Sequence, residues 1–480
     1  MSFSSVFFLF FFLPVALFLY FVMGRSCRNP VLLLISLIFY AWGENVYVLL
    51  MTGSVAGNYL FGRMISESMH PGRKKSLLIL AILFNLLPLL YFKYSAFFLH
   101  GLHTFFPALV AGDHPDPHLP IGISFFTFQA LSYVIDVFRG ISRPQKNIFD
   151  LGLYVALFPQ LIAGPIVRYH DIARQLRKRA HTVEGFASGV ERFIFGLSKK
   201  MLLANPLGEL ADTVFALSSS SLSLSTAWLG VVSYSLQIYF DFSGYSDMAI
   251  GLGRMFGFTF PENFNYPYIS RSVREFWRRW HISLSCWFRD YLYIPLGGSR
   301  CGSLCTYRNL LLVFLLCGLW HGANWTFVVW GLFHGLFLAV EHGWSGRSAQ
   351  TVCRPWLQHV YMILFICNSW VFFRADSVAH AFSYLHAMYD ATSLQLHPLA
   401  AIHLDAHFIS VFLIAILLAM PVYPSTLRTI SLLLYRKTER MKAIAIGGPF
   451  VRVGSLGLLL VSCAMSLAAG SYNPFIYFRF

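Results

Sequence analysis

Charged side chains are scarce in this sequence. Only 12% of its 480 residues are Asp, Glu, Lys or Arg, whereas 57% are hydrophobic; soluble domains carry about 25% charged residues. Apolar stretches near the length of a bilayer crossing recur from end to end. These features argue against a soluble protein and predict a polytopic membrane protein. Hydrocarbon cannot satisfy free backbone N–H and C=O groups, so such a chain spans as helices or as a closed barrel. The apolar runs are continuous rather than alternating, which favours the all-α class.

The sequence also lacks any CxxC pair. Its eight cysteines are scattered, mostly within or beside apolar segments. Cys301 and Cys305 form the closest pair, and we interpret them as ordinary small apolar residues. We therefore expect neither disulfides nor bound zinc, and no other set of side chains suggests a metal site.

No Lys or Arg precedes the first apolar stretch, from Val6 to Met23, and no small-residue cleavage site follows it. This pattern predicts a retained first helix rather than a cleaved secretion signal. Lys and Arg number 36, against 21 Asp and Glu. In a membrane protein such an excess collects in cytoplasmic loops, so it favours membrane lipid or cytoplasmic anions as partners over nucleic acid.

The apolar runs predict about eleven transmembrane helices plus partial crossings. We find no internal repeat and no separate soluble domain, so we expect a single membrane domain over residues 1–480. It comprises N-terminal helices (1–110), a core with re-entrant segments (120–340) and C-terminal helices (357–480). The expected helices cover residues 4–23, 30–42, 45–62, 77–99, 120–138, 148–166, 186–204, 226–256, 308–340 (one long helix, bent at its glycines), 357–373, 406–423 and 449–470.

Basic clusters set the expected orientation. Arg25 and Arg28 follow the first predicted helix, and residues 73–75 follow the third, whereas the segments "AWGEN" and "HGLHTFFPALVAGDHPDPHL" lack Lys and Arg. The N-terminus is therefore expected on the outer side. A full crossing by residues 148–166 would place the basic cluster at 168–179 on the wrong side. We favour a re-entrant segment there, broken by its prolines, with a full crossing as the alternative.

His321 lies in a run from Asn309 to Val340 that contains no charged residue. An ionisable group at that depth is costly and tends to mark a functional site. Gly318 and Gly322 flank it and would let a helix or a ligand approach closely. The alternative is a neutral imidazole that only hydrogen-bonds a neighbouring helix. His334, in the same run, is expected only to pack.

His281, in "FWRRWHISLS", is the second candidate. Forty residues separate it from His321, about 60 Å along one straight helix, so the two meet only if the chain folds back between them. The arginines around it, among them Arg278, Arg279 and Arg289, interleave with aromatic residues and are expected at the cytoplasmic interface.

Asp241 lies in a largely apolar run, four residues after Gln237. A carboxylate there must be paired or solvated. It would orient a histidine or an arginine, contact a polar substrate, or belong to the proton relay of a transporter.

Several long strings together are similar to the membrane-bound O-acyltransferase (MBOAT) family, and within it to the bacterial alginate O-acetyltransferase branch. They are "GISFFTFQALSYVIDVFRG", "LIAGPIVRY", "IYFDFSGYSDMAIGLG", "FWRRWHISLSCWFRDYLYIPLGG", "LWHGANWTFVVWG" and "NPFIYFRF". The resemblance implies that His321 is the catalytic histidine and His281 a second functional one. It also implies membrane helices around a thinned centre in a bacterial inner membrane, with a periplasmic N-terminus. Partners in that branch are a periplasmic SGNH-type acetyltransferase or a polysaccharide-secretion complex.

On this interpretation His321 acts as general base on an acceptor hydroxyl, and Asn324, Trp325 or His281 faces the carbonyl oxygen that gains charge. Arginines between 271 and 289 hold the phosphates of acetyl-CoA, the expected donor substrate, and no bound cofactor is needed. The acceptor stays open between alginate, peptidoglycan, cellulose and teichoic acid. A polysaccharide or lipid transporter and a scaffold without chemistry are the alternatives from other classes.

Overall fold

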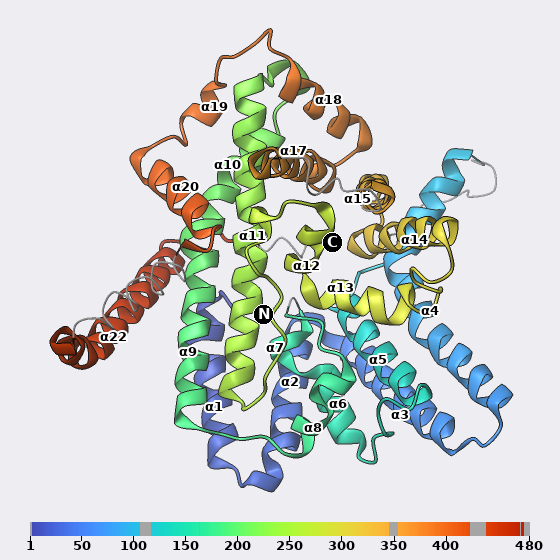
Figure 1. The fold of residues 1–480 in the computed structure, drawn as a ribbon. Coiled ribbons are helices and arrows are strands. Elements are labelled where there is room, and N and C mark those ends of the chain that lie inside the picture. Colours follow the sequence, from blue (N-terminus) through green and yellow to red (C-terminus); the bar gives the residue numbers. More distant parts are fainter. Residues whose placement is uncertain are drawn as a thin grey trace.

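The computed structural model describes residues 2–105, 117–162, 164–344, 354–422, 438–470 and 472–474, and within these ranges it contains no strand. Helices α9 (Val183–Ser198) and α11 (Leu224–Met255) run side by side through the middle of the molecule (Figure 1). Five helical stretches in the described part are long and apolar enough to cross a membrane, and three shorter apolar helices accompany them. The prediction of an all-α, polytopic membrane protein is confirmed.

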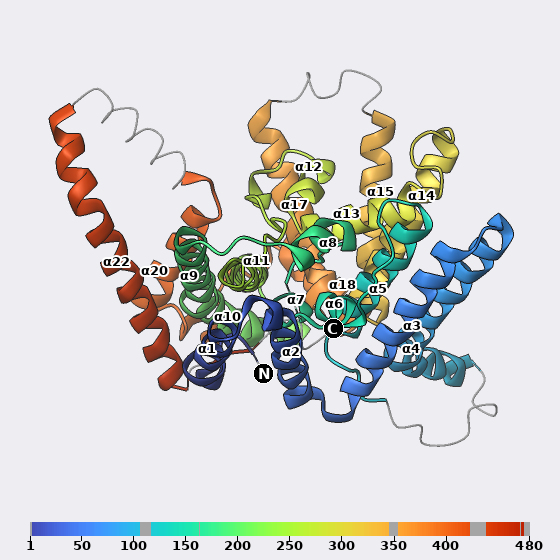
Figure 2. The same cartoon turned by 90° about the horizontal axis from the view of Figure 1, so that it is seen from below.

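The N-terminal helices form one flank of the molecule. Helices α3 and α4 extend away from the centre together (Figure 2), and Asn58 and Asn85 join them through reciprocal amide hydrogen bonds of 2.9 and 2.7 Å. The elements of this part are η1 (Phe8–Phe12), α1 (Leu13–Val22), η2 (Arg25–Cys27), α2 (Arg28–Glu44), η3 (Asn45–Tyr47), α3 (Val48–Glu67), α4 (Pro71–Phe105) and α5 (Ile123–Phe138).

Helices α9 and α11 form a closely packed spine, to which η4 (Lys199–Ala204) and α10 (Asn205–Phe215) belong. A Cβ on Gly196 would lie 2.5 Å from the carbonyl oxygen of Gly244, so only glycine allows this approach. Ion pairs fix the contact: the buried Lys200 lies 2.8 Å from Asp241, and the half-buried Lys199 lies 2.6 Å from Asp247. Asp241, expected to be paired or solvated, is paired.

The segment expected to be re-entrant is built from short helices. They are α6 (Ile148–Ala156), α7 (Phe158–Leu161) and α8 (Tyr169–Arg177). Nine residues of α6 span about 14 Å, less than half of the roughly 30 Å hydrocarbon core. The break at Leu157 and the length of α6 support the re-entrant interpretation over a single crossing helix.

The expectation of one long helix over residues 308–340 is wrong. The chain forms two antiparallel helices instead, α14 (Ser303–His321) and α15 (Trp325–Trp344). Gly322 is extended (φ −172°, ψ 153°) and ends α14, and the Asn324 side chain accepts a 3.0 Å hydrogen bond from the Thr326 N–H at the start of α15. His321 is therefore the last residue of a helix, not the middle of one.

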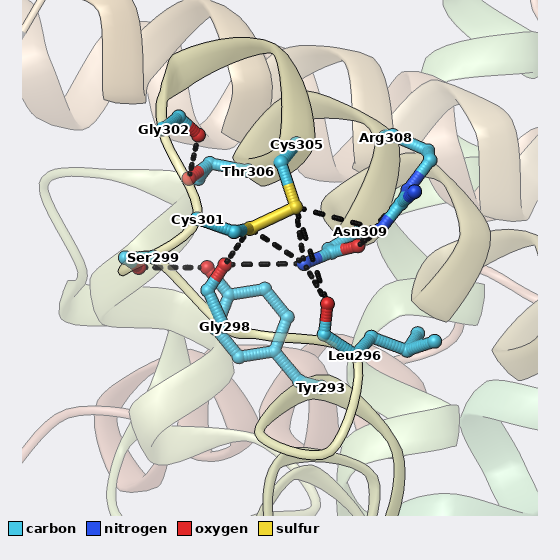
Figure 3. Close-up of a disulfide and its surroundings, with 10 residues drawn as sticks. All are labelled: Tyr293, Leu296, Gly298, Ser299, Cys301, Gly302, Cys305, Thr306, Arg308 and Asn309. Carbon is cyan, nitrogen blue, oxygen red and sulfur yellow. Dashed lines mark hydrogen bonds between the residues drawn. A yellow bond between two sulfur atoms is a disulfide. The ribbon is translucent and has the colours of Figure 1, made fainter.

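The expectation of no disulfide is also wrong. Cys301 and Cys305 are bonded, with Cα atoms 5.6 Å apart, and join a loop to the first turn of α14 (Figure 3). The loop turns tightly because Gly297, Gly298 and Gly302 have φ values of +103°, +57° and +90°. The sequence contains no CxxC pair, and a CxxxC pair comes into bonding range only through this glycine-dependent turn.

The C-terminal helices close the opposite end of the molecule (Figure 1). Helix α22 lies at the edge of the molecule beside α9 (Figure 2), where Arg452 pairs with Glu191. Its apolar window is only 6% buried, as expected of a surface that faces lipid. The remaining elements are η5 (Ser219–Ser221), η6 (Pro267–Ile269), α12 (Val273–Arg279), α13 (Ile282–Phe288), η7 (Arg289–Tyr293), α17 (Pro355–Arg374), α18 (Val378–Tyr389), α19 (Pro398–Ala401), α20 (Ala406–Leu418) and α22 (Thr438–Ala468).

Candidate active site

His321 is buried at the end of α14, with 5% of its surface exposed. Its ring packs edge-on against Trp320, Trp330 and Phe373, with centroid separations of 4.9, 5.1 and 5.0 Å. Among the described residues its Nδ1 has no hydrogen-bond partner. A buried imidazole nitrogen without a partner is costly, and such groups are found where a ligand supplies the missing partner.

His321 lines a cavity of about 430 Å³, which we call the histidine cavity. Its wall comes from the C-terminal end of α14, from α4 and from the start of α5. Lys93, His118, Ser124 and Trp320 also line it. The cavity is large enough for a small acyl group and the part of an acceptor that carries the hydroxyl.

A second cavity, of about 750 Å³, lies further down α14. We call it the arginine cavity because Arg274, Arg278 and Arg289 line it, together with Phe314 and Cys317 of α14. Three guanidinium groups around one cavity favour an anionic ligand such as a phosphate ester.

The two cavities are lined by residues from consecutive turns of α14. Cys317 lines the arginine cavity, and His321, four residues later, lines the histidine cavity. Residues four apart lie on the same face of a helix, about 6 Å apart along its axis. A group held beside Cys317, at one end of the arginine cavity, is therefore one helical turn from His321.

His281 is fully buried between α12 and α13, where its φ of 43° places it in the left-handed region. A non-glycine residue there costs about 1–3 kcal/mol and often marks a functional site. Its Nδ1 lies 3.1 Å from the Asn263 Oδ1, whereas its Nε2 has no partner among the described residues.

The chain does fold back between the two histidines. The rings of His281 and His321 both pack against Trp320, at 6.0 and 4.9 Å. The indole N–H of Trp320 also lacks a hydrogen-bond partner in the described part of the chain. Three polar ring nitrogens thus gather at one buried point without partners.

The arginines separate into two groups. Arg278 and Arg289 line the arginine cavity, and Arg289 also pairs with Asp290 at 2.7 Å. Burial raises the pKa of Asp290, but Arg289 and Arg168 outweigh it and hold that pKa below its ordinary value, so this carboxylate stays ionised. Arg279 pairs with Glu275 at 2.9 Å instead and is not among the residues that line the cavity.

The other predicted site residues lie elsewhere. Asn324 caps α15 and donates to the Asp376 carbonyl at 3.2 Å, at a neighbouring cavity of about 300 Å³. Trp325 is 61% exposed and packs on Phe97. Asp241 belongs to the spine. The structure brings none of the three into contact with His321. His334 is buried and accepts a 3.1 Å hydrogen bond from the Trp277 indole, whereas its Nε2 has no partner among the described residues; that it only packs stays a prediction.

Sequence reasoning missed Lys93 and Trp320, which share the histidine cavity with His321. Lys93 carried a usable signal, because it is the one charged residue between Ser76 and Phe105 of α4 and a lone cation in an apolar helix tends to be functional. Trp320 carried none, since tryptophan is common in such helices.

The comparisons with known proteins identify the family of this chain. Residues 36–379 match the membrane-bound O-acyltransferase family, a range that includes both histidines and both cavities. The chain belongs to this family: it is an acyltransferase and a multi-pass membrane protein.

Relatives of two kinds match along the whole chain. The chain is 41% identical to the probable alginate O-acetylase AlgI of Pseudomonas aeruginosa and 40% identical to that of Azotobacter vinelandii, in both cases over 100% of each protein. It is also 35% identical to the peptidoglycan O-acetyltransferase of Helicobacter pylori, over 100% of this chain and 97% of that one.

Proposed function

We propose that this protein moves an acetyl group from acetyl-CoA across the bacterial inner membrane for the O-acetylation of an exopolysaccharide such as alginate. Full-length identity of 40–41% to probable alginate O-acetylases supports the polymer class. A periplasmic SGNH-type acetyltransferase or a polysaccharide-secretion complex receives the acetyl group, and the N-terminus faces the periplasm.

The observation that carries this proposal is the succession of the two cavities along α14. A donor whose phosphates lie among Arg274, Arg278 and Arg289 has its thioester directed toward Cys317. An acceptor enters from the histidine cavity. The two substrates then meet at the same turn of α14, where His321 ends the helix.

His321 acts as a general base in this reaction. The acceptor oxygen forms a bond to the acetyl carbon while its proton passes to the imidazole. The carbon–sulfur bond then breaks, and the imidazolium returns the proton to the leaving thiolate of CoA. Proton transfer by a positioned imidazole contributes about 10²–10⁴ in rate. The Trp320 indole N–H, which has no partner among the described residues and whose ring packs on His321, is a candidate to donate a hydrogen bond to the carbonyl oxygen. His281 does not fit that role, because its Nδ1–H donates to the Asn263 Oδ1 and its neutral Nε2 is an acceptor.

The test compares His321→Ala with wild type in cells that lack the native gene, by measuring ester-linked acetate on the secreted polymer. His386→Ala is the matched control, because His386 is exposed on α18. We expect loss of acetate for His321→Ala and wild-type levels for His386→Ala. Wild-type acetylation by membrane-inserted His321→Ala would refute the role of His321.

O-Acetylation of peptidoglycan is the second candidate, supported by the 35% full-length identity to the Helicobacter pylori enzyme; cellulose or teichoic acid would need the same chemistry. Ester-linked acetate measured separately on isolated cell wall and on secreted polysaccharide distinguishes them. If radiolabelled polymer or lipid crosses the membrane without covalent transfer of acetate, the protein is a transporter instead.

A further inference from the structure

Lys93 of α4 reaches the C-terminal end of α14. Its ammonium donates to the Trp320 carbonyl at 2.5 Å and lies 3.4 Å from the His321 carbonyl. The last carbonyls of a helix have no intrahelical donor, and a cation is favourable there because it complements the helix dipole. The next residue of α4 acts in the same way: the Tyr94 hydroxyl donates to the Leu319 carbonyl at 2.7 Å.

The same ammonium lines the histidine cavity. Within the described residues its contacts are the two carbonyls rather than a carboxylate, and no Asp or Glu lines that cavity. A lysine whose ammonium only avoided the hydrocarbon would extend its side chain toward the membrane surface. Lys93 is instead held against the backbone of His321.

We propose that Lys93 is a positioning residue of the acyl transfer. Its ammonium fixes the carbonyls of Trp320 and His321, and thereby fixes the direction in which the imidazole leaves α14. The extended Gly322 that follows leaves this end of the helix without continuation, so the orientation of the ring depends on contacts from α4. The proposal rests on the proposed role of His321.

The first test measures the position of the imidazole without requiring acyl transfer. The purified full-length protein is treated with diethylpyrocarbonate, and the modification of His321 is followed by peptide mass spectrometry, with exposed His386 as internal reference. We expect Lys93→Met to raise the modification rate of His321 at least about tenfold, as loss of a charge-assisted hydrogen bond implies. Lys93→Arg, which keeps the charge and the donors, should stay near wild type.

An unchanged His321 modification rate in Lys93→Met would overturn the proposal. Tyr94→Phe separates the cation from the neighbouring bond to Leu319: because it keeps the ammonium, we expect a smaller rise in His321 modification than in Lys93→Met. If Lys93→Met does not fold, Lys93→Gln replaces it, since its amide donates but carries no charge.

The second test measures release of CoA from acetyl-CoA with the purified periplasmic SGNH-type acetyltransferase as acceptor. We expect Lys93→Met to lower kcat about 100-fold, the cost of a misplaced catalytic group, with an unchanged KM for either substrate and with recovery in Lys93→Arg. A raised KM for the acceptor with unchanged kcat would mean that Lys93 binds substrate and would overturn the positioning role. If wild type itself released no CoA, the proposed function would fail, and the modification experiment would still decide the role of Lys93.

Discussion

The spine and the candidate active site differ in how their ionisable groups are paired. In the spine the buried Lys200 pairs with Asp241, and the half-buried Lys199 pairs with Asp247. Around α14 the Nδ1 of His321, the Nε2 of His281 and the indole N–H of Trp320 have no partner among the described residues.

This difference separates the groups that hold the helices together from the groups that are available to react. A buried charge inside a membrane protein must be neutralised by its neighbours, so paired groups hold helices together. A neutral imidazole has a smaller desolvation cost and can remain without a partner until substrate arrives. Substitutions in the spine should therefore lower stability, and substitutions at the site should lower activity.

The largest effect on activity is expected for His321→Gln. Glutamine keeps a polar side chain but cannot act as a base, so turnover should fall by about 10²–10⁴, while the midpoint of thermal unfolding in detergent stays within a few degrees of wild type. A large fall in that midpoint would show that His321 belongs with the structural groups and would remove the contrast.

The largest effect on stability is expected for Lys200→Met. It removes the ammonium that lies 2.8 Å from Asp241 in a site where both side chains are 2% exposed, and breaking a buried pair in this way costs about 3–5 kcal/mol. The double variant Lys200→Met/Asp241→Leu should recover most of the loss. Thermal unfolding of the three proteins measures the coupling, and equal losses in single and double variants would contradict it.

A smaller effect, on the KM for acetyl-CoA, is expected for Arg278→Ala. Arg278 lines the arginine cavity, whereas Arg279 pairs with Glu275. Loss of one charge-assisted contact to a phosphate should raise the KM for acetyl-CoA about tenfold. Arg279→Ala is the matched control and should leave that KM unchanged. Equal KM values in both variants would exclude the cavity as the donor site.

The smallest expected effect is on the pH dependence of stability and involves His170. A hydrogen bond from His170 Nδ1 to Asp136, at 2.8 Å, raises the pKa of His170 above its ordinary value of 6.5; burial and Arg168 oppose this rise, and Asp171 adds to it. A raised folded-state pKa contributes stability that is fully present below pH 6.5 and is lost as pH rises through the folded-state pKa. His170→Gln should be less stable than wild type below pH 6.5 and approach it above. A difference that does not change with pH would contradict this assignment.

The sequence predicts most of the helices because continuous apolar runs are visible in one dimension. It also identifies His321 and His281, since ionisable residues stand out in apolar surroundings. The division into α14 and α15 was missed, although the sequence carries a signal for it. Gly322 after His321, followed by Asn324 as an N-cap, is the pattern of one helix ending and another beginning, but the uncharged, largely apolar run on both sides favoured a single helix. The disulfide depends on a turn of three glycines, and the contact between Lys93 and α14 joins residues more than two hundred positions apart. Such contacts arise from packing and leave no local pattern.

Because α14 stops at His321, the direction of the imidazole depends on the register of α14 as well as on the contacts from α4. A residue inserted between Ser303 and Trp320 would rotate the ring by about 100° about the helix axis and carry it away from both cavities. A residue inserted after Gly322 would be taken up in the connection to α15, with the ring left in place. The two sides of this glycine should therefore differ sharply in the length changes they tolerate.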